Sequence, residues 1–81
     1  MRMVKDAPVM SFLDIGEEYP DDYALVRIVE IDHSKGVQVG IVLCVSSSDS
    51  ELYAYSNREG IAEITIVIQG DNLLPVLGGL L

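Results

Sequence analysis

A run of short oxygen-bearing side chains, Ser46 to Ser50, could bind a phosphate group or cap a helix. It follows an apolar stretch and precedes a helix-like stretch, and a helix N-terminus carries unpaired N–H groups and partial positive charge. The run lacks the glycines and lysine of a phosphate-binding loop, and Asp49 and Glu51 add negative charge there. We therefore interpret it as a capping box, in which Ser48 and Glu51 start the helix.

The usual nucleophile and general base occur once each, as Cys44 and His33. A catalytic Cys–His pair must lie within hydrogen-bond reach. His33 falls in a predicted hairpin turn and Cys44 inside a predicted strand, which does not favour such a pair. We expect His33 to be solvated and Cys44 to be a small packed hydrophobe. No catalytic residue is predicted, and the question of enzyme activity stays open.

Acidic residues dominate the charge, with 13 Asp and Glu against 5 Lys and Arg and a net charge of −8. The densest cluster, residues 14–22, lacks the alternating ligands and central glycine of an EF-hand loop. A single cysteine excludes a multi-cysteine zinc site. We predict no metal and no cofactor. The charge disfavours nucleic acid and anionic membranes and favours a basic protein partner.

Length and hydropathy indicate one small domain. A chain of 81 residues buries roughly 60–65% of its unfolded surface, and 49% hydrophobic against 22% charged residues is typical of folded proteins. No apolar run reaches the length of a membrane span, and residues 1–10 lack the apolar core of a signal peptide. We expect a cytoplasmic protein in which residues 1–10 form a loose leader.

The elements that position these residues follow from the hydrophobic pattern. Residues 23–32 and 36–45 are rich in β-branched residues, and the "DHSKG" between them is typical of a hairpin turn. Residues 49–59 are predicted to be a helix that ends before Gly60, and 61–70 a third strand. A short helix is predicted after Ser11, with the apolar anchors Phe12, Leu13 and Ile15.

This ββαβ succession predicts an α+β domain with a three-stranded antiparallel sheet in the order 2-1-3 and one helix on one face. A crossover through the helix makes strand 61–70 parallel to 36–45, so it can pair antiparallel with 23–32. The odd-numbered residues of 36–45 are all apolar and are predicted to face the core. Gly40 predicts a bulge or a close approach by a neighbouring side chain.

More apolar surface is present than one helix can cover. Strand 61–70 is a predicted sheet edge with few charges, and such edges tend to pair with another chain. The apolar tail, 71–81, must dock on the domain or on a partner. We predict a homodimer whose interaction surface includes Ile64, Ile66, Ile68, Leu73, Leu74 and Leu77. The alternative is that the N-terminal segment and the tail cover the bare face.

The stretches "YPDDYALVRIVEID", "GVQVGIVLCV" and "IAEITIVIQGDN" together resemble small uncharacterised bacterial proteins that carry a ββαβ unit. The resemblance covers roughly residues 19–72. It implies an α+β fold and a bacterial cytoplasmic protein, and it carries over no catalytic residue.

These observations favour a protein-interaction or regulatory module that acts through self-association or a basic protein partner. An antitoxin or inhibitor that neutralises a basic protein would be a sharper version. The alternative is a small-ligand-binding protein or an enzyme whose site forms across a dimer interface. Its polar groups would be the tyrosines Tyr19, Tyr23, Tyr53 and Tyr55.

Overall fold

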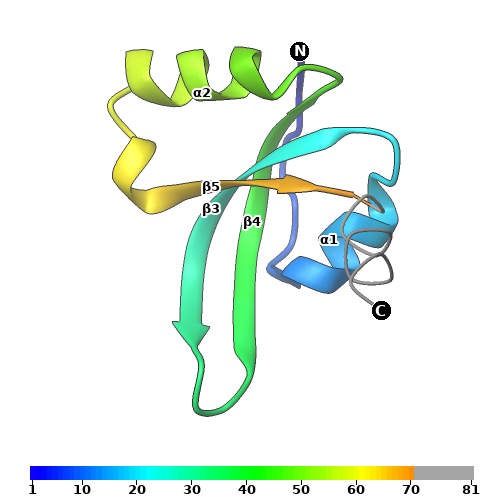
Figure 1. The fold of residues 1–81 in the computed structure, drawn as a ribbon, viewed down its shortest axis with the longest axis vertical. Coiled ribbons are helices and arrows are strands. Elements are labelled where there is room, and N and C mark those ends of the chain that lie inside the picture. Colours follow the sequence, from blue (N-terminus) through cyan, green and yellow to red (C-terminus); the bar gives the residue numbers. More distant parts are fainter. Residues whose placement is uncertain (71–81) are drawn as a thin grey trace, which may run out of the picture.

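The computed structural model describes residues 1–70, which form a twisted antiparallel sheet and two α-helices (Figure 1). The elements in chain order are β1 (Arg2–Met3), β2 (Met10–Ser11), α1 (Phe12–Glu18), β3 (Tyr23–Asp32), β4 (Val37–Ser46), α2 (Asp49–Arg58), the short 3-10 helix η1 (Ala62–Ile64) and β5 (Thr65–Gln69). The predicted α+β class is confirmed. Within residues 1–70, neither α-helix has the length or apolar character of a membrane span.

Within residues 1–70 the sheet has five strands, so the prediction of three strands in the order 2-1-3 is wrong. The order is β1-β4-β3-β5, and β2 also pairs with β4. The two predicted neighbour pairs, β3 with β4 and β3 with β5, are present and antiparallel. The extra strands are β1 and β2, and three of their four residues fall in the segment 1–10 that is predicted to be a loose leader. Strands of two residues are too short to leave a periodic pattern in the sequence.

The hairpin between β3 and β4 is confirmed, and Asp32 organises its turn. One carboxylate oxygen of Asp32 accepts the Ser34 hydroxyl at 2.7 Å and the backbone N–H groups of Ser34 and Lys35 at 3.1 and 3.3 Å. Gly36 has a φ of 68°, a left-handed conformation that glycine adopts without strain. The Ser34 hydrogen bond lowers the pKa of the Asp32 carboxyl.

A register shift in the hairpin changes which residues of β4 face which side. Leu25 lies opposite Cys44 and Val26 opposite Val42, so Leu43 has no partner on β3. An unpaired residue of this kind is a β-bulge, and it interrupts the alternation of side chains. The prediction that all odd-numbered residues of β4 face one core is therefore wrong.

Two hydrophobic clusters lie on opposite faces of the sheet. Successive side chains of a strand point to opposite faces, and Ala24 and Val26 of β3 belong to one cluster whereas Leu25 belongs to the other. The α1-side cluster contains Ile15, Ala24, Val26, Val42, Val45 and Ile68, and Val4, Ala7, Met10, Phe12 and Tyr19 pack against it. The α2-side cluster contains Leu25, Cys44 and Leu52. The N-terminal segment and α1 thus cover the face that α2 leaves bare.

The third predicted strand, 61–70, begins later than expected. Residues 62–64 form η1, and the chain becomes extended only at Thr65. The Thr65 hydroxyl donates to the backbone carbonyl of Ile61 at 2.9 Å, which closes the turn before the strand. The resulting β5 has five residues and lies at the end of the sheet order.

Gly40 provides the first prediction. A Cβ at this position would lie 2.5 Å from Val26 Cγ1 and 2.6 Å from the Arg27 carbonyl oxygen, so the predicted close approach is confirmed. We expect Gly40→Ala to lower the free energy of unfolding by about 1–3 kcal/mol, measured by urea denaturation. Gly16→Ala in α1 is the matched control, because its Cβ would meet its nearest neighbours at 3.8 Å, and it should be neutral or slightly stabilising. Equal losses in both variants would contradict this explanation.

Candidate functional site

The serine run after β4 is organised around Ser46, a buried residue at the end of that strand. Its hydroxyl accepts the Ser48 backbone N–H at 3.0 Å and donates to Glu51 Oε1 at 2.7 Å. Ser48 is the N-cap of α2, but its side chain makes no capping hydrogen bond and lies 2.9 Å from the Ser50 hydroxyl. The predicted Ser48–Glu51 capping box is therefore wrong, because Ser46 takes the hydrogen bond to Glu51.

The electrostatics at this helix start oppose anion binding. The Ser46 hydroxyl, followed by the N-terminal ammonium group of Met1 at 2.9 Å, lowers the pKa of the Glu51 carboxyl. Glu51 is therefore charged at neutral pH, and Asp49 lies in the same turn. A phosphate would be repelled by two carboxylates here. The arrangement therefore stabilises the start of α2 and disfavours phosphate binding.

The structure does not bring His33 and Cys44 together. His33 is exposed in the β3–β4 turn, whereas Cys44 lies near the other end of β4, fully buried against Leu25 and Leu52. Burial raises the pKa of the Cys44 thiol. A buried, protonated thiol without a neighbouring base is a poor nucleophile, so this cysteine contributes packing to the α2-side cluster.

Three of the four tyrosines pack on the sheet, and they are divided between its two faces, whereas Tyr53 is exposed. Tyr19 packs on the α1-side cluster, whereas Tyr23 and Tyr55 pack on the α2-side cluster. The Tyr23 hydroxyl is 3.4 Å from the Gln69 amide nitrogen, and the Arg58 guanidinium lies 5.5 Å from the centre of the Tyr55 ring. They therefore do not line one shared site within residues 1–70.

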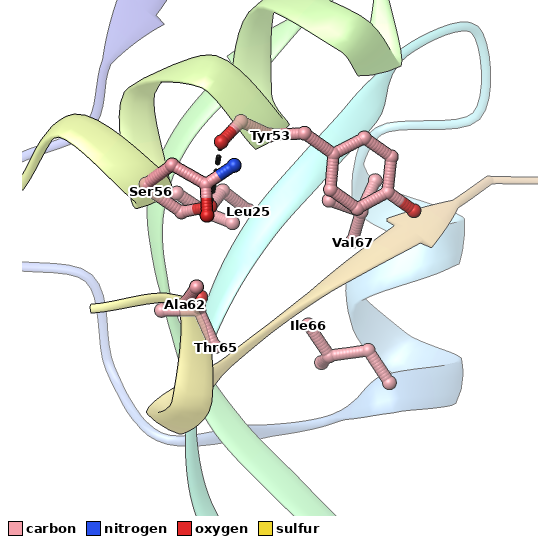
Figure 2. Close-up of a pocket in the computed structure, with 8 residues that line it drawn as sticks. Leu25, Tyr53, Ser56, Ala62, Thr65, Ile66 and Val67 are labelled. Atoms are coloured by element: carbon pink, nitrogen blue, oxygen red, sulfur yellow. Dashed lines mark hydrogen bonds between the residues drawn. The ribbon is translucent and has the colours of Figure 1, made fainter. Parts of the chain in front are cut away.

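A small pocket lies between α2 and β5 (Figure 2). It is lined by Leu25, Tyr53, Ser56, Asn57, Ala62, Thr65, Ile66 and Val67. Its volume is about 80 Å³, below the roughly 300–1,000 Å³ of typical ligand sites. The Ser56 hydroxyl already donates to the Tyr53 carbonyl at 2.9 Å, and that of Thr65 to Ile61. The pocket has room for water-sized molecules and offers few free polar groups.

The acidic cluster lies on and after α1, where Asp14, Glu17, Glu18 and Asp21 are exposed. Among residues 1–70, no three His, Cys, Asp or Glu side chains are arranged to hold a metal ion. The Asp14 backbone N–H donates to the Ser11 hydroxyl at 3.0 Å, which confirms the predicted cap of this helix. Carboxylates on this surface are available to a cationic partner.

The predicted interaction residues are only partly gathered on one surface. Ile64 and Ile66 are 50% and 38% exposed along the η1–β5 segment. Ile68 is buried in the α1-side cluster, 8% exposed. Leu73, Leu74 and Leu77 lie outside the described residues. No residue of β5 is charged, and among residues 1–70 the only sheet neighbour of β5 is β3.

A groove between α1 and β5, which we call the α1–β5 groove, has a volume of about 460 Å³. It is lined by Phe12, Leu13, Gln38, Ile66, Val67, Ile68 and Gln69. Leu13 was expected to anchor α1 in the core, but its side chain is 72% exposed. Helical spacing gives the reason, because Phe12 and Ile15 are three residues apart on one face and Leu13 is rotated away from it.

Comparisons with known proteins do not identify a family for this chain. No protein-family model matches the chain, and neither a curated protein nor a solved structure matches it. The resemblance of residues 19–72 to small bacterial ββαβ proteins therefore stays a prediction.

The roles of the two serines provide the second prediction. Ser46→Ala removes the acceptor of the Ser48 N–H and the donor to Glu51, so we expect it to lower the free energy of unfolding by about 1 kcal/mol. Ser48→Ala is the control, and its effect should stay within about 0.5 kcal/mol because its side chain makes no cap. Chemical denaturation measures both. A larger loss for Ser48→Ala would restore the capping box.

A pH dependence provides the third prediction. The pKa of Glu51 in the folded protein lies below its ordinary value of 4.5, mainly because of the Ser46 hydroxyl. The resulting stabilisation is therefore present above pH 4.5 and is lost as the pH falls through the lowered pKa. We expect Ser46→Ala to lose less stability than the wild type between about pH 5 and 3. Identical pH profiles would show that this hydroxyl does not hold the charge of Glu51.

Proposed function

We propose that this protein is a protein-interaction or regulatory module that acts as a homodimer, in which β5 of one copy pairs with β5 of the other. The observation that carries the proposal is the edge of β5, which lies at the end of the sheet order and which no other strand of residues 1–70 pairs with. Its unpaired backbone groups offer a template for a further strand. A second copy presents the same edge, so a two-fold axis would satisfy both.

Features that protect a sheet edge are missing from β5. Natural edge strands are blocked by charged side chains, proline or bulges. The five residues of β5 include no charge and no proline, and the register shifts of the sheet lie in the β3–β4 pair. The exposed side chains of Ile64 and Ile66 add apolar surface beside this edge. An additional strand would therefore gain backbone hydrogen bonds and apolar contact together.

Charge also favours β5 as the contact. Two copies with a net charge of −8 each repel one another at long range, and salt screens this repulsion over about 8–10 Å. Approach costs least where the surface carries no carboxylate, as along β5. The proposed dimer should therefore become tighter as the salt concentration rises.

The exposed carboxylates of α1 support a second part of the proposal, a basic protein partner. Asp14, Glu17 and Glu18 lie on a different element from β5, so a dimer through β5 would leave them accessible. Binding of a cationic protein here would suit an inhibitor or antitoxin. A cytoplasmic location fits this role, since the single cysteine of the chain is a buried thiol.

Self-association provides the fourth prediction. Ile66→Lys places a cation on the β5 edge and should weaken dimerisation at least about tenfold, roughly 1.4 kcal/mol. Ile31→Lys is the matched control, because Ile31 has nearly the same exposure, 39% against 38%, but lies in the β3–β4 hairpin. Sedimentation velocity over a concentration series measures both variants and the wild type.

We expect the wild type and Ile31→Lys to dimerise with similar affinity. A wild type that stays monomeric at every concentration would refute the dimer. Dissociation of Ile31→Lys, with Ile66→Lys still dimeric, would move the interface from β5 to the hairpin.

A further inference from the structure

We infer that the apolar segment 71–81 binds in the α1–β5 groove of its own chain. The inference is independent of the proposed dimer, since the groove is formed by one copy alone. It assigns an occupant to the groove and a binding role to a segment that carries one charged residue among eleven, Asp71.

The groove has the character of a site for apolar side chains. Leu13 stands on one wall, 72% exposed, beside the half-buried ring of Phe12. The other wall is β5, which contributes Ile66 and Ile68, and Gln38 comes from β4. The volume of about 460 Å³ lies within the usual range of ligand sites. The groove thus brings several apolar side chains together on one surface, and contiguous apolar surface of this kind favours an occupant.

The chain leaves β5 beside the C-terminal end of α1, one residue after Gln69 of the groove, because Gly70 makes close contacts there. Its backbone N–H donates to the Asp22 carbonyl at 3.3 Å. A Cβ on Gly70 would lie 2.5 Å from the Tyr19 carbonyl oxygen and 2.6 Å from that of Pro20. Gly16 of α1 is also adjacent, since a Cβ there would meet Gly70 Cα at 3.8 Å. Residue 70, the last described residue, therefore lies beside the last turn of α1.

The composition and length of segment 71–81 suit the groove. Its sequence, "DNLLPVLGGLL", contains five leucines and one valine. Burial of such side chains is the main favourable contribution to folding and association. Eleven residues can extend about 35 Å, which is ample to follow a wall formed by five-residue β5. Pro75 and the two glycines allow the segment to turn back along it.

Geometry favours the groove of the same chain over that of a second copy. In an antiparallel β5–β5 pair, residue 70 of the partner would lie beside the start of this copy's β5. That end adjoins η1 and α2, whereas α1 lies at the other end of the strand (Figure 1). The chain's own segment is tethered beside the groove, which gives it a high effective concentration there.

Disulfide trapping in the full-length protein tests the inference. Leu13→Cys is combined in turn with Leu73→Cys, Leu74→Cys and Leu77→Cys, and each variant is oxidised at low protein concentration. We expect at least one pair to form a disulfide within one chain, seen as the loss of two hydrogens by intact mass and as a monomer on a non-reducing gel. Native Cys44 is buried and serves as the internal unreactive thiol.

The matched control moves the first cysteine to Val29, which is 47% exposed but lies in the hairpin. We expect at least about tenfold slower trapping with Val29→Cys than with Leu13→Cys, because disulfides form only between close Cα atoms. Equal rates from the two positions would overturn the inference, as would no disulfide in any of the three pairs. Disulfide-linked dimers as the main product would instead place the segment on a second copy. A β5 dimer does not confuse the result, because mass separates intrachain from interchain bonds.

Discussion

The pairing of β3 with β4 is the interaction on which the rest of the structure depends, because every other strand within residues 1–70 is hydrogen-bonded to one of these two. The bulge at Leu43 determines which residues of β4 belong to each of the two hydrophobic clusters. It places Val42 on the α1 side and Cys44 on the α2 side with an extra residue between them, so that Val45 returns to the α1 side. A short chain thus buries both faces of its sheet with one small helix on each.

The sequence was sufficient where the signal is local and repeated. The hairpin, both helices and the two main strand pairings could be predicted from β-branched runs, turn residues and caps. It was insufficient for β1 and β2, since pairs of residues carry no period, and for the bulge at Leu43, which a regular apolar row conceals. The start of α2 shows the same limit. Ser46 and Ser48 are the same residue type, and only the position at which β4 ends determines which hydroxyl donates to Glu51.

The candidate surface was predictable in part for similar reasons. The predicted pairing of strand 61–70 with 23–32 was enough to place it at the sheet edge, and Ile64 and Ile66 are exposed there. Ile68 belongs to the same alternating row, yet it is buried because α1 and its neighbours cover that end of β5. The sequence of a strand does not show which of its residues an element distant in the chain will cover. Leu13 could have been recognised, since helical spacing separates it from Ile15.

The two sides of β5 call for different occupants. Its free backbone edge requires a partner with an unbroken row of N–H and C=O groups, whereas the α1–β5 groove requires apolar side chains. Segment 71–81 is apolar but contains Pro75, Gly78 and Gly79, which remove a donor and weaken an extended strand. It is therefore a poor strand for the edge and a suitable occupant of the groove. By the same reasoning, an uncharged five-residue strand of a second copy suits the edge.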